Sequence, residues 1–75
     1  MKIEVLGTGC ADCIKLYENT KNALDESGKE GEVVKVEGIA AMLKYGILNP
    51  PALVIDGQVK FSGQLLSVAE IKGML

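Results

Sequence analysis

Two cysteines are the residues of this chain best suited to do chemistry. They lie three positions apart, as Cys10 and Cys13, in the segment GTGCADC at residues 7–13. Such a pair can cross-link a fold, bind a soft metal ion, or alternate between a dithiol and a disulfide. A structural cross-link is the weakest of these interpretations, because so short a loop hardly constrains the unfolded chain. The secondary structure predicted around the pair is needed to distinguish metal binding from dithiol–disulfide exchange.

The composition narrows the class of protein. The 75 residues are 48% hydrophobic and include only two tyrosines and one phenylalanine, so we expect one domain at residues 1–75 with an aliphatic core. The net charge is −2 and the basic residues form no cluster, so we expect no nucleic-acid partner. No apolar run approaches the roughly 20 residues that span a bilayer, and the N-terminus does not resemble a signal peptide. We therefore expect a cytoplasmic monomer with no membrane partner, in a compartment where thiols are kept reduced.

The first half of the chain predicts two strands with a helix between them. The segment IEVL at 3–6 and the β-branched segment EVVKVE at 32–37 are typical of strands. Between them, apolar residues recur at helical spacing, and Gly28 is suited to the left-handed position that ends a helix. The buried side of this helix is expected to carry Cys13, Leu16, Tyr17, Thr20 and Leu24.

The second half predicts a helix, a hairpin and a last helix. Good helix formers at 39–45 indicate a short helix. In PALVIDGQVKFSG, two apolar strands flank Asp56 and Gly57, the pair favoured in a tight two-residue turn. Ser67 and Glu70 form a capping box that begins a C-terminal helix. Its buried side is expected to carry Val68, Ile71 and Leu75.

The order β-α-β-α-β-β-α predicts an α/β fold with a four-stranded mixed sheet and three helices. The cysteine pair then lies at the carboxyl edge of the first strand, where open α/β sheets place their sites. Cys10 would lie at a helix N-terminus, which favours its thiolate, although Asp12 opposes this effect and Lys15 offsets Asp12. Cys13 would be shielded on the apolar side of the helix. Such an asymmetric pair suits dithiol exchange, in which Cys10 attacks a substrate disulfide and Cys13 resolves the mixed disulfide.

Three segments resemble the thioredoxin fold family, and together they span essentially the whole chain. They are CADC at 10–13, KYGILNPPALVIDG at 44–57, which resembles the stretch that runs through a cis-proline, and FSG at 61–63. The resemblance implies a thioredoxin-like fold close to glutaredoxin in size. It implies a thiol–disulfide oxidoreductase that uses Cys10 and Cys13 and needs no cofactor and no metal. The expected partners are a protein disulfide substrate and an upstream dithiol reductase.

The resemblance also implies a substrate groove lined by Gly9, Pro50, Pro51 and Gly63, with a cis bond between the two prolines. The chain departs from the family at two of these places. The usual tryptophan before the first cysteine is replaced by Thr8 and Gly9, which leaves a more open site. Pro50 has no N–H, so one backbone hydrogen bond to an extended substrate is lost.

Glu4 lies six residues before Cys10, where thioredoxin places a buried acid that helps to deprotonate the second cysteine. By resemblance, Glu4 is a possible proton acceptor for Cys13. The alternative is an ordinary edge carboxylate in solvent. No secure set of glutathione contacts is present, so glutathione is not supported as the substrate.

The main rival is a heavy-metal-associated domain, the fold of small copper chaperones. The segment GTGCADCIKLYENTKNAL resembles its metal-binding loop and helix, and two thiolates can bind Cu(I). The predicted helix at 39–45 and the C-terminal helix disagree with that fold. A closed zinc site needs four ligands, whereas this chain offers two cysteines and no histidine. A redox switch on a partner-binding module is a non-enzymatic alternative.

Overall fold

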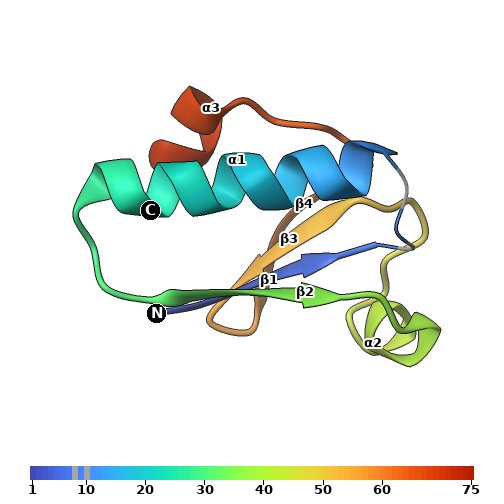
Figure 1. Cartoon of the computed structure of the whole chain (residues 1–75). Coiled ribbons are helices and arrows are strands. Elements are labelled where there is room, and N and C mark those ends of the chain that lie inside the picture. The colour runs from blue at the N-terminus through green and yellow to red at the C-terminus, as the bar shows by residue number, and fades with distance from the viewer. Residues whose placement is uncertain (8, 10) are drawn as a thin grey trace.

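Three helices and four strands follow in the predicted order across residues 1–7, 9 and 11–75, the part of the chain that this computed structural model describes (Figure 1). The predicted α/β fold class is confirmed, and most bounds differ from expectation by only a residue or two, although the last helix ends at Lys72, before the expected Leu75. The elements are β1 (Lys2–Leu6), α1 (Ala11–Ser27), β2 (Glu32–Val36), α2 (Ile39–Lys44), β3 (Ala52–Ile55), β4 (Gln58–Ser62) and α3 (Val68–Lys72).

The sheet is mixed, with the strand order β2-β1-β3-β4. β1 and β2 are parallel because α1 connects them as a crossover, whereas β3 runs antiparallel to both β1 and β4. Leu6 at the end of β1 therefore lies between Val36 of β2 and Ala52 of β3. This register brings the end of β1, the end of β2 and the start of β3 to one edge of the sheet.

Helices cover both faces of the sheet, with α1 and α3 on one face and α2 on the other (Figure 1). Because side chains alternate along a strand, the two central strands supply two separate apolar clusters. The cluster under α1 and α3 contains Ile3, Val5, Leu53 and Ile55 from the sheet, and the cluster under α2 contains Leu6, Ala52 and Val54. Full burial of one such aliphatic side chain contributes about 1.5–3 kcal/mol, so these clusters are the main source of stability.

Local turn and cap signals form as expected. Asp56 and Gly57 both have positive φ, at 50° and 83°, as the tight turn between β3 and β4 requires. At the start of α3, the Glu70 N–H donates to Ser67 Oγ at 3.2 Å, and the Ser67 N–H donates to Glu70 Oε1 at 3.1 Å. The predicted hairpin and capping box are thus both confirmed.

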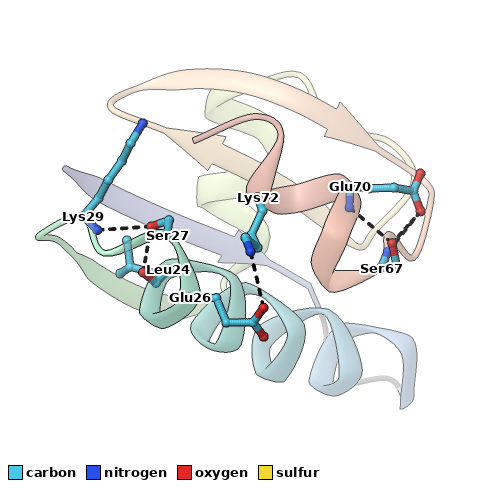
Figure 2. Close-up of polar contacts among 7 residues, drawn as sticks. All are labelled: Leu24, Glu26, Ser27, Lys29, Ser67, Glu70 and Lys72. Atoms are coloured by element: carbon cyan, nitrogen blue, oxygen red, sulfur yellow. Dashed lines mark hydrogen bonds and ion pairs between the residues drawn. The ribbon is translucent and has the colours of Figure 1, made fainter.

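The C-terminal end of α1 is closed by local hydrogen bonds and is joined to α3 by an ion pair (Figure 2). Ser27 Oγ donates to the Leu24 carbonyl at 2.7 Å and accepts the Lys29 N–H at 3.2 Å, which closes the last turn of α1. Lys72 Nζ lies 3.4 Å from Glu26 Oε1 and joins α3 to α1. Both members of this ion pair are exposed, so it contributes at most about 1 kcal/mol. These contacts lie at the end of α1 away from the cysteines.

Candidate redox site

Cys13 lies in the first turn of α1 and is only 2% exposed. It is disulfide-bonded. Leu16, one turn later, is fully buried in the apolar cluster beneath the helix, so the same side of α1 buries both residues. Cys10 and Thr8 lie outside the described residues, so the roles given to Cys10 and its pairing with Cys13 stay predictions.

Gly7 leaves β1 directly beneath Cys13. Its N–H donates to the Val36 carbonyl at 3.0 Å, which extends the ladder between β1 and β2 by one residue. A Cβ atom at Gly7 would lie 2.3 Å from Cys13 Sγ and 2.8 Å from Cys13 Cβ, far inside van der Waals contact. The glycine therefore leaves the space that the buried cysteine occupies.

Pro50 and Pro51 are joined by a cis peptide bond, as the resemblance implied. Pro51 is buried, and its carbonyl accepts the Gly63 N–H at 2.9 Å. Gly63 has a φ of +78°, and a Cβ atom there would lie 3.4 Å from Asn49 Cβ. The proline segment and Gly63 are thus in direct contact, and the groove that they were predicted to line stays a prediction.

The strand register places this proline segment at the edge of the sheet where Cys13 lies. Ala52 pairs with Leu6 in β1 and with Ser62 in β4, so residues 7, 51 and 63 follow one another across the same edge. Gly9, the remaining predicted groove residue, is exposed at this edge and has a φ of +82°. The described residues of the predicted site, Glu4 apart, therefore gather in one region.

Glu4 has a different position. It is half-buried in β1, between Val34 and Val54, so the expectation of an edge carboxylate in solvent is wrong: β1 is an interior strand. The Tyr45 hydroxyl donates to Glu4 Oε1 at 3.3 Å. Partial burial raises the pKa of Tyr45, and the charge and the hydrogen bond of Glu4 raise it further. A role of Glu4 as proton acceptor for Cys13 stays a prediction.

Strand alternation also sets the direction of the Glu4 side chain. Ile3 and Val5 belong to the cluster under α1, whereas Leu6 belongs to the cluster under α2. Glu4 therefore points to the α2 side, where Tyr45 meets it, while Cys13 belongs to α1 on the opposite side.

A second carboxylate, which the sequence analysis did not identify, lies next to the segment that joins β1 to α1, which we call the redox loop. Glu37 follows β2, and its Oε2 would lie 3.7 Å from a Cβ atom at Gly9. Its other oxygen, Oε1, lies 3.5 Å from Lys35 Nζ, and that ammonium lies 5.9 Å from the centre of the Tyr17 ring. The sequence did contain a signal for this proximity, because the predicted parallel pairing of β1 and β2 brings together the residues that follow the two strands.

The arrangement defines a class of protein. A helix that begins with a buried, disulfide-bonded cysteine packs against a mixed sheet, beside a cis-proline segment, which suits dithiol–disulfide exchange. Among the described residues, no group of three or more histidine, cysteine, aspartate or glutamate side chains is placed to hold a metal ion. None of the helices in this part of the chain is long and apolar enough to cross a membrane.

Comparison with known proteins agrees with this class. A family model described as a thioredoxin domain matches residues 1–75. A protein named Thioredoxin from Methanothermobacter thermautotrophicus is 39% identical over 75 residues, which are 100% of this chain and 97% of that protein. Another protein named Thioredoxin, from Methanocaldococcus jannaschii, is 37% identical over 70 residues, which are 93% of this chain and 80% of that protein. The chain belongs to the thioredoxin domain family.

Membership of this family confirms the predicted fold and the predicted class of activity, a thiol–disulfide oxidoreductase. The alternative of a Cu(I)-binding domain is not favoured, because both relatives are named for the redox family and α2 and α3 are present as predicted.

Proposed function

We propose that Cys10 and Cys13 form the redox couple of this oxidoreductase, that residues 1–75 act as one domain, and that the substrate is a disulfide in another protein. The observation that carries the proposal is the burial of Cys13, which is 2% exposed and packed against Gly7. A thiol in that position is shielded from external disulfides and is suited to resolve a bond formed by its neighbour. Cys10 is then the attacking thiol.

The exchange takes place in two steps. The Cys10 thiolate attacks one sulfur of the substrate disulfide, which forms a mixed disulfide and releases the other substrate sulfur as a thiolate. The Cys13 thiolate then attacks Cys10 Sγ, which forms the Cys10–Cys13 disulfide and releases the second substrate thiolate. Both released thiolates take up a proton, so two electrons and two protons pass to the substrate. An upstream dithiol reductase in the cytoplasm returns the couple to its reduced form.

The substrate segment binds in an extended form across Gly9, Pro50, Pro51 and Gly63. The Pro51 carbonyl is already engaged by the Gly63 N–H, and Pro50 has no N–H to donate. We therefore propose that the segment is held chiefly by its side chains and the mixed disulfide, and that the range of substrates is narrower than for a groove with a free backbone donor.

Single substitutions of the two cysteines test the assignment. We expect Cys10→Ser to abolish reduction of a protein disulfide by the protein, because the remaining thiol, Cys13, is buried and shielded from the substrate. We expect Cys13→Ser to accumulate a mixed disulfide with the substrate, detectable by mass, because nothing resolves it. A Cys13→Ser variant that turns over at the wild-type rate, or a Cys10→Ser variant that forms the mixed disulfide, would overturn the assigned roles.

The reduction potential provides a second test. Equilibration of the wild-type protein in graded thiol–disulfide buffers should give a value between about −270 and −120 mV, the range of known exchange proteins. A value well below about −300 mV would mark a structural bond that resists reduction by the glutathione pool and would contradict the proposal.

A further inference from the structure

We propose that the Glu37 carboxylate disfavours the thiolate of the reduced redox couple and thereby makes this protein a stronger reductant. The proposal rests on the proposed function, since it takes Cys10 and Cys13 to be that couple. Glu37 is a positioning residue in this scheme: it makes no contact with a substrate and acts through the field that it imposes on the redox loop.

The strand pairing brings Glu37 to the loop. Leu6 pairs with Val36, and the Gly7 N–H donates to the Val36 carbonyl at 3.0 Å, so the chain after β2 leaves the sheet beside the chain after β1. Glu37 Oε2 consequently lies 3.7 Å from the position of a Cβ atom at Gly9. Gly9 immediately precedes Cys10 in the chain, so Glu37 brings a negative charge next to the loop that carries the proposed couple. The effect should weaken as salt screens the charge.

Lys35 orients the carboxylate. Its ammonium lies 3.5 Å from Glu37 Oε1 and 5.9 Å from the centre of the Tyr17 ring, one helical turn after Cys13. One oxygen of Glu37 is therefore held by a cation, while the other faces the loop. The side chains of Lys35 and Glu37 are 36% and 57% exposed, so the pair adds little to stability. Substitutions of either residue should leave the fold intact and change mainly the field.

The sign of the effect follows from the charges of the two redox states. The disulfide is neutral, whereas the reduced couple carries a negative charge once a thiol has ionised. An ionised Glu37 repels that charge, which destabilises the reduced form and favours the loss of two electrons to the substrate disulfide. Asp12 of α1 acts in the same direction, and Lys15 of α1 and Lys35 of β2 act in the opposite one.

The test compares Glu37→Gln with Lys35→Gln. Glu37→Gln is nearly isosteric, and the two substitutions change the net charge by one in opposite directions. Glu30→Gln is the matched control, since Glu30 is exposed in the loop before β2, at the opposite end of that strand from Glu37. The thiolate fraction of each reduced variant is measured from its rate of alkylation as a function of pH.

At a pH below the pKa of the thiol, we expect Glu37→Gln to raise the thiolate fraction roughly three- to tenfold, the size expected for the removal of a nearby unit charge in a partly screened site. Lys35→Gln should lower it, and Glu30→Gln should leave it unchanged. At a pH above the pKa of the thiol, the equilibrium constant for thiol–disulfide exchange between glutathione and Glu37→Gln should differ from that of the wild-type protein by the same factor. This corresponds to a potential higher by about 14–30 mV, given about 29.6 mV for each tenfold change.

Two results would overturn the proposal. One is a thiolate fraction for Glu37→Gln equal to that of Glu30→Gln. The other is a shift in the same direction for Glu37→Gln and Lys35→Gln, which would indicate a structural role for the ion pair. Failure of the proposed function is recognised separately, because the wild-type protein would then form no reversible Cys10–Cys13 disulfide at any pH.

Discussion

Replacement of Gly7 by alanine tests whether the position of Cys13 depends on the missing side chain beneath it. The new Cβ would lie 2.3 Å from Cys13 Sγ, whereas nonbonded heavy atoms need about 3.5 Å. The two residues would therefore have to separate by more than about 1 Å. Neither can move freely, because Gly7 is hydrogen-bonded to Val36 in the sheet and Cys13 belongs to a helix packed on the core. Gly7 does not have a positive φ, so the effect is steric and not a matter of backbone conformation.

Gly7→Ala should have two measurable consequences, a loss of stability and a slower resolution of the mixed disulfide. Forcing a methyl group into a packed site costs typically about 1–3 kcal/mol, which a domain with about 5–15 kcal/mol of stability survives. Since about 1 kcal/mol shifts the Tm of a domain this small by roughly 4–8 °C, the loss is readily measured. A displacement of about 1 Å at a reacting group can slow its step by as much as about 100-fold, so Cys13 should resolve the mixed disulfide much more slowly.

The assay combines urea unfolding with the lifetime of the mixed disulfide. Gly38→Ala is the matched control, because Gly38 has a φ of −79° and nothing lies within 4 Å of a Cβ atom there. A double-mutant cycle with Cys13→Ala removes the sulfur, so the Gly7→Ala substitution should cost less in that background. The steric argument is refuted if Gly7→Ala matches Gly38→Ala in both stability and mixed-disulfide lifetime, or if the cost is unchanged without the Cys13 sulfur.

Three further predictions concern the frame that holds the site. Ser67→Ala should lower the free energy of unfolding by about 0.5–2 kcal/mol, measured in urea, because the Glu70 N–H loses its acceptor; Ser67→Asp, which keeps an acceptor, should lose much less. Gly57→Ala should cost roughly 1 kcal/mol because the residue has a φ of +83°, and a loss no greater than that of Gly38→Ala would contradict the turn assignment. The raised pKa of Tyr45 means that the folded state holds this proton more tightly than the unfolded chain. Stability contributed by Tyr45 is therefore complete below the usual value of 10.0 and is lost as pH rises above it, and Tyr45→Phe should abolish this part of the alkaline decline. An alkaline decline that is the same in both proteins would show that the contact with Glu4 has no such effect.

The sequence by itself determined most of the local structure. The Asp56-Gly57 turn, the Ser67–Glu70 capping box and the apolar side of α1 each depend on residues a few positions apart, so their signals can be recognised without the fold. The order of the elements then determined the mixed sheet, because crossover and hairpin connections leave few arrangements. The cis bond at Pro51 came from the resemblance to a family and not from local pattern, since prolines occur mostly in trans.

Only the tertiary structure decided which distant residues meet at the site. The contact of Gly7 with Cys13 arises because α1 folds back over the end of β1, so a glycine that suits a turn also makes room for a sulfur. The hydrogen bond between Tyr45 and Glu4 depends on which face of the sheet α2 covers. The approach of Glu37 to Gly9 depends on how far each strand runs before it ends. Packing and register set these contacts, because each joins residues that are far apart in the chain or depends on how far a strand runs, and the spacing of residues along the chain does not specify either.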